Sequence, residues 1–316
     1  MSNVFEEATK RGKELPGYAH GAKLIRVDEI ESQIDFISGI VYAQVHLMRA
    51  SLAIRRLHMS LMVPRDDGLK PAIVYFPGGG FVSANHEQFL QMRFALAKGG
   101  FVVASAEYRT VPDTYPGLVE DGKSAIRFLR AHAAAYGIDL NRIGALGDSA
   151  GGYLAQMVGL THGEKAYDQG DYLDQTSSVQ AAATIFGISN LLNIGEGFST
   201  ESQQIHQSPS VTEALLVNGP AFDNFPGASI ASDPEKARAA SPMGHIDGKH
   251  PPFLIMHGTA DTLVSPIQSK QLYEALSTAG RKPDYVLVEG AGHGGAPWHQ
   301  KPIIDTVVNW FKTNLA

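Results

Sequence analysis

The sequence predicts an α/β protein built on a mostly parallel, doubly wound sheet. From residue 71 onward, short apolar runs alternate with segments of helical length, and each run is bounded by Gly, Pro or Asp. Buried parallel strands take this form because helices cover both faces of the sheet. The expected strands are residues 72–76, 101–106, 142–146, 181–186, 253–256 and 285–288.

The helices expected between these strands complete the alternation. They cover residues 87–98, 117–136, 150–162, 265–279 and 302–314. In the second of them Ala125, Phe128, Leu129 and His132 recur at helical spacing, which predicts one face packed on the sheet. Upstream, residues 39–47 and 52–63 predict an antiparallel pair that forms the N-terminal edge of the sheet.

Residues 187–250 interrupt this rhythm. The segment is rich in Gly, Ser, Asn and Pro, and it contains one short helical candidate, residues 211–217. A loop of this length without secondary structure is uncommon unless it is functional, so we expect an inserted lid over a site, within a single domain that covers residues 1–316. A mobile insertion without a role is the alternative. Phe198, Phe222 and Phe225 are expected either to form a small core of the insertion or to bind an aromatic substrate group.

Composition and charge exclude several classes of protein. The 316 residues include 26 Lys and Arg against 32 Asp and Glu, and no long basic run is present, which argues against a nucleic-acid partner. The absence of cysteine excludes disulfides, thiolate metal sites and a Cys nucleophile. The charged residues 1–17 lack the apolar run of a secretory signal, and no apolar stretch approaches the roughly 20 residues needed to cross a bilayer. We expect a soluble, cytoplasmic protein with no membrane partner.

Gly147-Asp148-Ser149-Ala150-Gly151 is the strongest candidate for a catalytic motif. One expected strand ends just before it and a helix begins just after it, which is the strand, tight turn and helix of a nucleophile elbow. Glycines suit such a turn because a side chain there would strike the neighbouring strand or helix. A Ser helix cap in a Gly-rich turn is the alternative.

Two further polar residues follow later strands. Asp261 lies in a loop after the strand at residues 253–256, and His293 lies in a Gly-rich loop after the strand at residues 285–288. Ligand chemistry collects at the carboxyl ends of parallel strands, so we expect Asp261 to be the acid and His293 the base of a triad with Ser149. A turn Asp and a surface His are the alternatives. The neighbouring His257 is expected to brace the loop that carries Asp261.

A Gly-rich turn also ends the strand at residues 72–76. The run Tyr75-Phe76-Pro77-Gly78-Gly79-Gly80-Phe81 can aim backbone N–H groups at a developing oxyanion, and we expect Gly79, Gly80 and Ala150 to be the donors. A phosphate-binding loop is the competing interpretation, but no Lys-Ser or Lys-Thr follows and no G-x-G-x-x-G is formed.

Together these motifs resemble the hormone-sensitive-lipase-like and acetyl-esterase-like carboxylesterases of the α/β-hydrolase superfamily. The likeness covers about residues 70–300 and rests on the oxyanion glycines, the Gly-Asp-Ser-Ala-Gly-Gly elbow and the His-Gly-x-x-Asp loop. Glu107-Tyr108-Arg109 is similar to the family's Asp-Tyr-Arg, and the stretch from Tyr115-Pro116 to Glu120-Asp121 is similar to its Phe-Pro and Glu-Asp. Pro77 departs from the family, which usually has the first His of His-Gly-Gly-Gly at this position.

The resemblance and the motifs predict a hydrolase that cleaves small carboxylic esters through an acyl-enzyme, with His293 as base, Ser149 as nucleophile and Asp261 orienting the imidazole. A short-chain acyl or acetyl ester is the expected substrate. An amide, as in a peptidase or arylformamidase, an aromatic ester of the feruloyl or gallate type, and a non-enzymatic binding module are the alternatives.

Substrate contacts and partners follow from the same interpretation. Phe81 and Val82, beside the glycines, are expected to shape the acyl pocket. No cofactor and no metal are expected, because the histidines form no H-E-x-x-H and no other ligand spacing. Relatives often pair as symmetric dimers, so a homodimer and a monomer both stay open.

Overall fold

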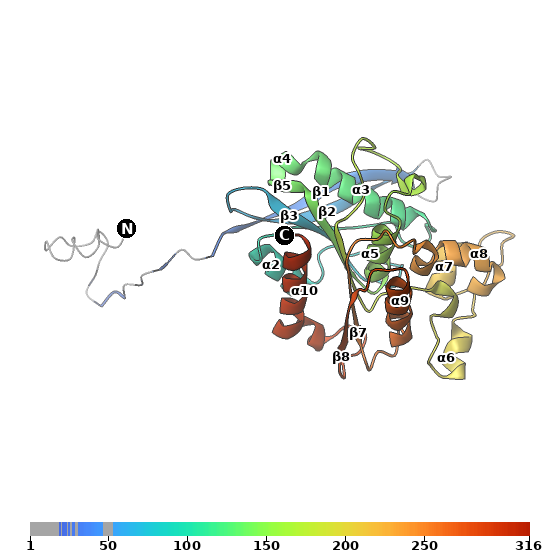
Figure 1. Ribbon diagram of the computed structural model, residues 1–316. Coiled ribbons are helices and arrows are strands. Elements are labelled where there is room, and N and C mark those ends of the chain that lie inside the picture. The colour runs from blue at the N-terminus through green and yellow to red at the C-terminus, as the bar shows by residue number, and fades with distance from the viewer. Residues whose placement is uncertain (1–18, 20, 24, 26, 29–30, 47–52) are drawn as a thin grey trace. The chain divides into compact units, whose positions relative to one another are not determined.

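The computed structural model describes residues 19, 21–23, 25, 27, 28, 31–46 and 53–316 (Figure 1). Contacts divide the chain into Met1–Ser32 and Gln33–Ala316, and the elements below all belong to the second unit. Its centre is an eight-stranded sheet in the order β1-β2-β4-β3-β5-β6-β7-β8. The strands are β1 Ile34–His46, β2 Ile54–Pro64, β3 Lys70–Phe76, β4 Val102–Ala106, β5 Ile138–Asp148, β6 Ala181–Ile185, β7 Phe253–Gly258 and β8 Asp284–Val288.

The predicted topology is confirmed. Strands β3 to β8 run parallel, and β1 and β2 add an antiparallel edge beside β4. The predicted ends of the antiparallel pair at Leu47 and Leu52 lie outside the described residues. Strand β4 lies on one side of β3 and β5 on the other, so the order of the strands reverses between β3 and β5. A crevice for ligands forms at such a switch point, outside the carboxyl ends of the strands.

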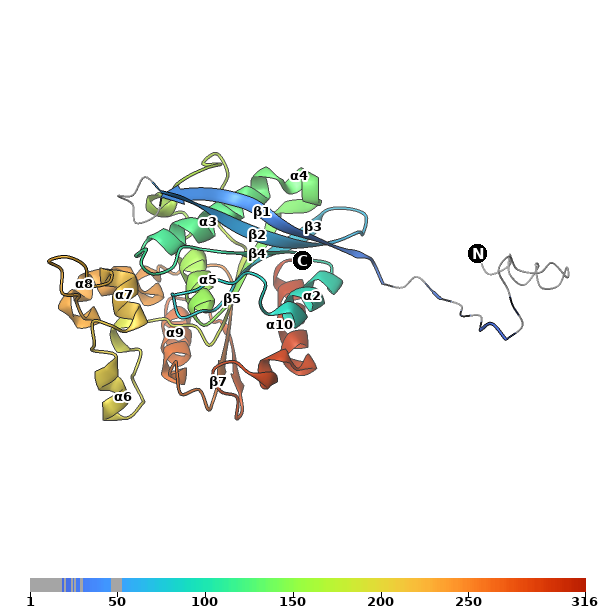
Figure 2. The same ribbon diagram turned by 180° about the vertical axis from the view of Figure 1, so that it is seen from behind.

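Helices cover both faces of the sheet (Figures 1 and 2). They are α2 Leu90–Lys98, α3 Gly117–Ala131, α4 Ala133–Tyr136, α5 Ala150–Leu160, α9 Pro266–Thr278 and α10 Lys301–Asn314. Alternate residues of β3 point to opposite faces: Val74 packs into the core beneath α3 and α5, whereas Ile73 packs into the core beneath α2 and α10. Among the described residues, no helix combines the length and the apolar character needed to cross a membrane.

Two predicted boundaries were wrong. The helix expected over residues 117–136 is interrupted at His132, where Ala135 N–H donates to the carbonyl three residues back. The His132 ring lies on Phe128 and its Nδ1 is 2.9 Å from the Phe128 carbonyl oxygen, so the imidazole binds at the end of the helix. Strand β5 begins at Ile138 rather than at residue 142, because Ile138 already pairs with Lys70 of β3 before the register shifts.

The inserted segment, residues 187–250, contains more helix than the single candidate predicted. Beside the expected helix α7, Thr212–Asn218, it has α6, Thr200–Ile205, and α8, Pro234–Ala239. Both additional helices begin at a side-chain cap. Ser199 Oγ accepts a hydrogen bond from the N–H of Ser202 at the start of α6. At the start of α8, the Asp233 side chain accepts one from the N–H of Lys236, and Pro234 occupies the first position of the helix.

The inserted segment packs on the body of the protein rather than around its own phenylalanines. Its residues Leu191, Leu216 and Ile230 belong to the same buried cluster as Ala150 and Tyr153 of α5. The prediction of a phenylalanine core in this segment is wrong for Phe222, whose side chain is 82% exposed. Hydrophobic burial therefore holds the inserted segment against α5 and the core on that face of the sheet.

Candidate active site

Ser149 lies in the sharp turn between β5 and α5. Its backbone has φ 53° and ψ −120°, a conformation that L-residues rarely adopt, and its N–H donates to the Ile185 carbonyl of β6 at 2.9 Å. The side chain is therefore presented at the carboxyl edge of the sheet and at the N-terminus of α5, where the helix dipole favours negative charge.

The glycines around Ser149 are required by close backbone contacts. A Cβ atom on Gly147 would lie 2.0 Å from the Gly151 carbonyl oxygen, and a Cβ on Gly151 would lie 2.0 Å from the Phe76 carbonyl oxygen. Real Cβ atoms do not approach backbone this closely. The turn can thus pack against β3 only because these two positions lack side chains.

The three residues expected to form a triad lie in one hydrogen-bonded row. Ser149 Oγ is 2.8 Å from His293 Nε2, and His293 Nδ1 is 2.8 Å from Asp261 Oδ2. An ionised carboxylate only accepts hydrogen bonds, so Nδ1 carries the imidazole proton and Nε2 accepts the hydroxyl of Ser149. In this tautomer the imidazole is placed to remove the serine proton.

Asp261 is held by its own loop. Its Oδ1 accepts hydrogen bonds from the N–H groups of Leu263 and Val264, and His257 Nε2 lies 3.3 Å from its Oδ2. Burial raises the pKa of Asp261, but the hydrogen bonds from His257 and His293 outweigh it, so the pKa lies well below its ordinary value. Asp261 is therefore ionised at neutral pH, and His257 has the bracing contacts that the sequence suggested.

Two aromatic residues that the sequence analysis did not single out pack around His293. The Phe186 ring is centred 4.6 Å from the imidazole and 4.8 Å from the Trp298 ring. Trp298 is buried and its indole N–H donates to the Gly292 carbonyl, one residue before His293. Phe186 packs directly against the imidazole, and Trp298 supports Phe186 and the loop that carries His293. The only signal for Phe186 in the sequence was its position at the end of the strand predicted over residues 181–186.

The oxyanion-loop glycines lie at the end of β3. No acceptor within the described part of the chain binds the N–H groups of Gly79, Gly80 or Ala150, so all three remain available to a ligand. The N–H of Gly78, by contrast, donates to Asp148 at 3.1 Å. Gly79 and Gly80 have φ 154° and 59°, values suited to glycine.

The two residues expected to shape the acyl pocket have different environments. Phe81 is 1% exposed and its ring meets Tyr153 edge to face at 5.2 Å, so it packs in the core. Val82 is 55% exposed beside the glycine turn. A substrate contact by either residue stays a prediction, and the packing favours a structural role for Phe81.

Three of the remaining motif residues, Arg109, Glu120 and Asp121, form a buried ion cluster. Arg109 donates to both carboxylate oxygens of Asp121 at 2.8–3.0 Å and to Glu120 at 2.9 Å. The cluster joins the segment after β4 to the start of α3. It gives a structural reason for the two motifs that resemble the Asp-Tyr-Arg and Glu-Asp stretches.

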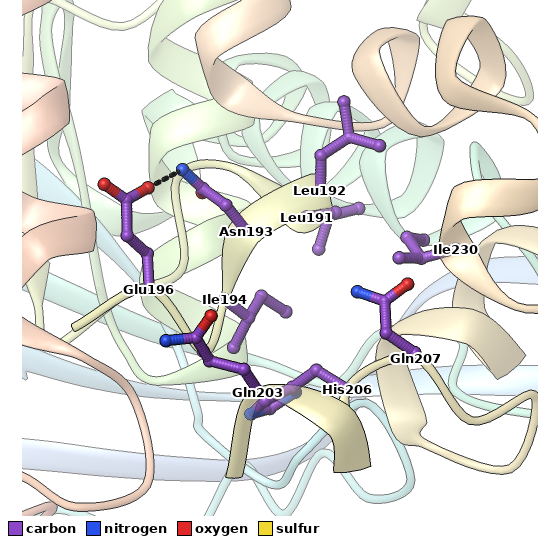
Figure 3. Close-up of a pocket in the computed structure, with 10 residues that line it drawn as sticks. Leu191, Leu192, Asn193, Ile194, Glu196, Gln203, His206, Gln207 and Ile230 are labelled. Carbon is purple, nitrogen blue, oxygen red and sulfur yellow. Dashed lines mark hydrogen bonds between the residues drawn. The ribbon is translucent and has the colours of Figure 1, made fainter. Parts of the chain in front are cut away.

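A pocket of about 210 Å³ opens in the inserted segment (Figure 3). Apolar side chains, three side-chain amides and one carboxylate share its wall, which is lined by Leu191, Leu192, Asn193, Ile194, Gly195, Glu196, Gln203, His206, Gln207 and Ile230. His206 Nδ1 is held 2.5 Å from the buried Glu213. Figure 3 shows the Glu196 carboxylate hydrogen-bonded to the Asn193 amide.

The mostly parallel sheet with a serine elbow at its switch point defines the α/β-hydrolase fold. The chain belongs to the BD-FAE family, whose model matches residues 59–276. The predicted resemblance to α/β-hydrolase carboxylesterases is therefore confirmed.

Comparisons with individual proteins agree with this family. The chain is 30% identical over 227 residues to esterase LipC of Mycobacterium tuberculosis, covering 71% of this chain and 53% of LipC. It is 29% identical over 243 residues to a probable isoprenylcysteine α-carbonyl methylesterase, ICMEL1, of Oryza sativa subsp. japonica, covering 75% of this chain and 54% of ICMEL1. The chain thus spans about half the length of these curated relatives.

Solved structures match over nearly the whole chain. A truncated carbohydrate esterase from gut microbiota superimposes with a TM-score of 0.75 at 25% identity, covering 91% of this chain and 98% of that one. Esterase 2 of Thermogutta terrifontis with butyrate bound gives a TM-score of 0.65 at 26% identity, covering 90% of this chain and 94% of that one.

Proposed function

We propose that this protein is a serine carboxylesterase that hydrolyses small carboxylic esters through an acyl-enzyme. The observation that carries the proposal is the row in which Ser149 Oγ and Asp261 Oδ2 each lie 2.8 Å from the His293 imidazole. The comparisons support the proposal, because LipC and Thermogutta esterase 2 are both named esterases and each matches most of this chain.

The reaction follows the geometry in two halves. His293 Nε2 accepts the Ser149 proton as Oγ attacks the ester carbonyl, and the resulting oxyanion receives hydrogen bonds from the N–H groups of Gly79, Gly80 and Ala150. The C–O bond to the alcohol then breaks, and the imidazolium gives its proton to the leaving alkoxide. In the second half a water molecule attacks the acyl-enzyme, His293 takes the water proton, and the acid leaves as Ser149 is reprotonated.

A short acyl group is the first part of the proposed specificity. Structures of Thermogutta esterase 2 have propionate or butyrate bound, and their TM-scores to this chain are 0.64 and 0.65. These acids are the acyl products that short-chain esters would release. An acetyl, propionyl or butyryl ester is therefore the proposed substrate.

A sugar as the alcohol part of the ester is a second candidate, favoured by two observations. One is the match to a carbohydrate esterase over 98% of that chain. The other is the pocket in the inserted segment, where Asn193, Gln203 and Gln207 offer amide donors and acceptors beside apolar side chains. The pocket begins at Leu191, six residues after Ile185, whose carbonyl binds the Ser149 N–H. A chain of six residues reaches about 20 Å at most, so this length is the upper limit on the distance between the Ile185 backbone and Leu191 at the wall of the pocket.

Other expectations stay predictions. Cleavage of an amide or an aromatic ester, a lid role for residues 187–250, a cytoplasmic location and a homodimer each await measurement. Residues 1–17, on which the expected location rests, lie outside the described residues.

The test is turnover of p-nitrophenyl acetate, butyrate and octanoate, of a p-nitroanilide, of methyl ferulate and methyl gallate, and of an acetylated methyl glycoside. We expect turnover of the acetate and butyrate, and its loss in Ser149→Ala with an unchanged circular dichroism spectrum. Ester hydrolysis that persists in Ser149→Ala, or a wild-type protein inactive on every ester, would overturn the proposal. Faster cleavage of the anilide than of the esters would favour the amide alternative.

A further inference from the structure

One peptide group at the start of the oxyanion loop is held at both ends. The peptide between Pro77 and Gly78 accepts a hydrogen bond at its carbonyl from the Tyr108 hydroxyl, at 2.6 Å. Its N–H donates to Asp148 Oδ1, at 3.1 Å, and the same oxygen accepts the Tyr75 hydroxyl at 2.6 Å. Because a peptide group is planar, fixing its two polar ends fixes the orientation of its plane.

The position of this peptide gives the contacts a consequence for catalysis. The next N–H along the chain is that of Gly79, followed by that of Gly80. Two hydrogen bonds at one end of the loop therefore fix the peptide plane from which the chain continues to both of these N–H groups. Downstream, the Phe81 carbonyl accepts the N–H of Val111 at 2.8 Å, so the loop is held on both sides of the glycines.

The same contacts join the loop to the nucleophile. Asp148 precedes Ser149, and a Cβ atom on Gly78 would lie 2.6 Å from Asp148 Oδ2 and 3.2 Å from Ser149 Cβ. The loop thus lies directly against the elbow. A shift of Asp148 would move the donors and the nucleophile relative to each other.

The side chains that hold the peptide lie in, or just after, three different strands, and both tyrosines among them are buried. Tyr108 is fully buried after β4, Tyr75 lies in β3, and Asp148 is the last residue of β5. Burial raises the pKa of Tyr108, which keeps its hydroxyl a donor at every physiological pH. Pro77 itself has neither an N–H nor a polar side chain, so the loop depends on groups outside it at this position.

We propose that Tyr108 and Asp148 are positioning residues, which hold the Pro77–Gly78 peptide so that the N–H groups of Gly79 and Gly80 point at the oxyanion. The inference rests on the proposed function, because it assigns those N–H groups as oxyanion donors. A buried tyrosine also needs a hydrogen-bond partner for stability alone, so the test must separate catalysis from folding.

The first test is Tyr108→Phe, with Tyr42→Phe as the matched control. Tyr42 is 2% exposed and its hydroxyl donates to a backbone carbonyl at the same distance, 2.6 Å, but that carbonyl belongs to Glu107 and not to the loop. We expect Tyr108→Phe to lower kcat by about 10- to 100-fold with little change in KM, because the donors are displaced rather than deleted. Tyr42→Phe should keep the wild-type kcat.

A trifluoromethyl ketone provides a readout that a merely structural role would not move. It forms a tetrahedral adduct with the nucleophilic serine, and its oxyanion occupies the same donors. Tyr108→Phe should weaken its inhibition constant by the same factor as kcat/KM. A structural role would lower the active fraction of the protein and leave the inhibition constant unchanged.

Variants of Asp148 give an independent test. Asp148→Asn retains an oxygen that can accept the Gly78 N–H, so it should keep most of the inhibitor affinity, whereas Asp148→Ala should lose it. An active wild type whose Tyr108→Phe variant keeps both kcat and inhibitor affinity would overturn this inference alone. Equal loss of inhibitor affinity in Tyr42→Phe would also overturn it. A wild type without ester turnover would overturn the proposed function and this inference together.

Discussion

Replacing Asp261 by Asn tests the proposed triad with minimal change in shape. Asp261 Oδ1 accepts two backbone N–H groups, and Oδ2 faces His293 Nδ1. In Asp261→Asn the amide oxygen keeps the two backbone bonds, because the opposite orientation would place an NH₂ group against two donors. The NH₂ group then faces Nδ1, which must lose its proton to accept it.

The consequence is a change of tautomer rather than a loss of structure. The imidazole proton moves to Nε2, the atom that lies 2.8 Å from Ser149 Oγ, and Ser149 loses its base. A substitution of this kind lowers kcat roughly 10⁴-fold in the Ser-His-Asp template of serine proteases. That factor corresponds to about 5.5 kcal/mol of transition-state stabilisation.

The assay is kcat and KM for p-nitrophenyl butyrate at pH 8, with the midpoint of urea unfolding measured in parallel. Asp284→Asn is the matched control, since Asp284 accepts the Trp310 indole N–H at the start of β8, the opposite end of that strand from the loop that carries His293, and should leave kcat unchanged. A variant that keeps more than about a tenth of the wild-type kcat would refute the reasoning, as would a loss of activity that parallels unfolding.

Three further substitutions test other parts of the structure. Gly151→Ala places a Cβ atom 2.0 Å from the Phe76 carbonyl oxygen, so it should lower the free energy of unfolding in urea by at least about 1–3 kcal/mol; wild-type stability would contradict the packing. Arg109→Met leaves the buried Asp121 without its counter-charge and should cost about 3–5 kcal/mol in the same measurement; a neutral effect would show that the ion cluster does not stabilise the fold. Burial raises the pKa of Glu107, but hydrogen bonds from two histidines lower it further, to about 2 from an ordinary 4.5. The ionised form of Glu107 therefore stabilises the fold fully above about pH 4.5, and this stabilisation is lost as the pH falls toward 2. The difference in free energy of unfolding between wild type and Glu107→Gln should therefore become smaller from pH 4.5 to pH 2. A difference that stays constant over this interval would contradict the assignment.

The sequence predicted the features that depend on local pattern. The buried strands appear as short apolar runs because helices cover both faces, and the order of β3, β5, β7 and β8 along the chain places four loops at one edge of the sheet. Ser149 was recognisable because a Cβ atom on Gly147 or Gly151 would lie 2.0 Å from a backbone oxygen, which excludes any side chain at these two positions. Such steric requirements leave a direct mark on the sequence.

Features that depend on tertiary contacts were missed. Helices α6 and α8 are short and start at caps such as Asp233, so they carry little apolar periodicity. The hydrogen bond from Tyr108 to Pro77 joins residues that are 31 positions apart in the sequence, and the bond from Gly78 to Asp148 joins residues that are 70 positions apart. No spacing rule brings such pairs together, because the packing of several strands determines them.

The most direct test of the central claim is peptide mapping by mass spectrometry after the protein has reacted with a fluorophosphonate. We predict a single covalent adduct on Ser149, no adduct in Ser149→Ala, and much slower formation in His293→Ala. Ester turnover accompanied by an adduct on another residue, or by none, would contradict the assignment of Ser149 as the nucleophile.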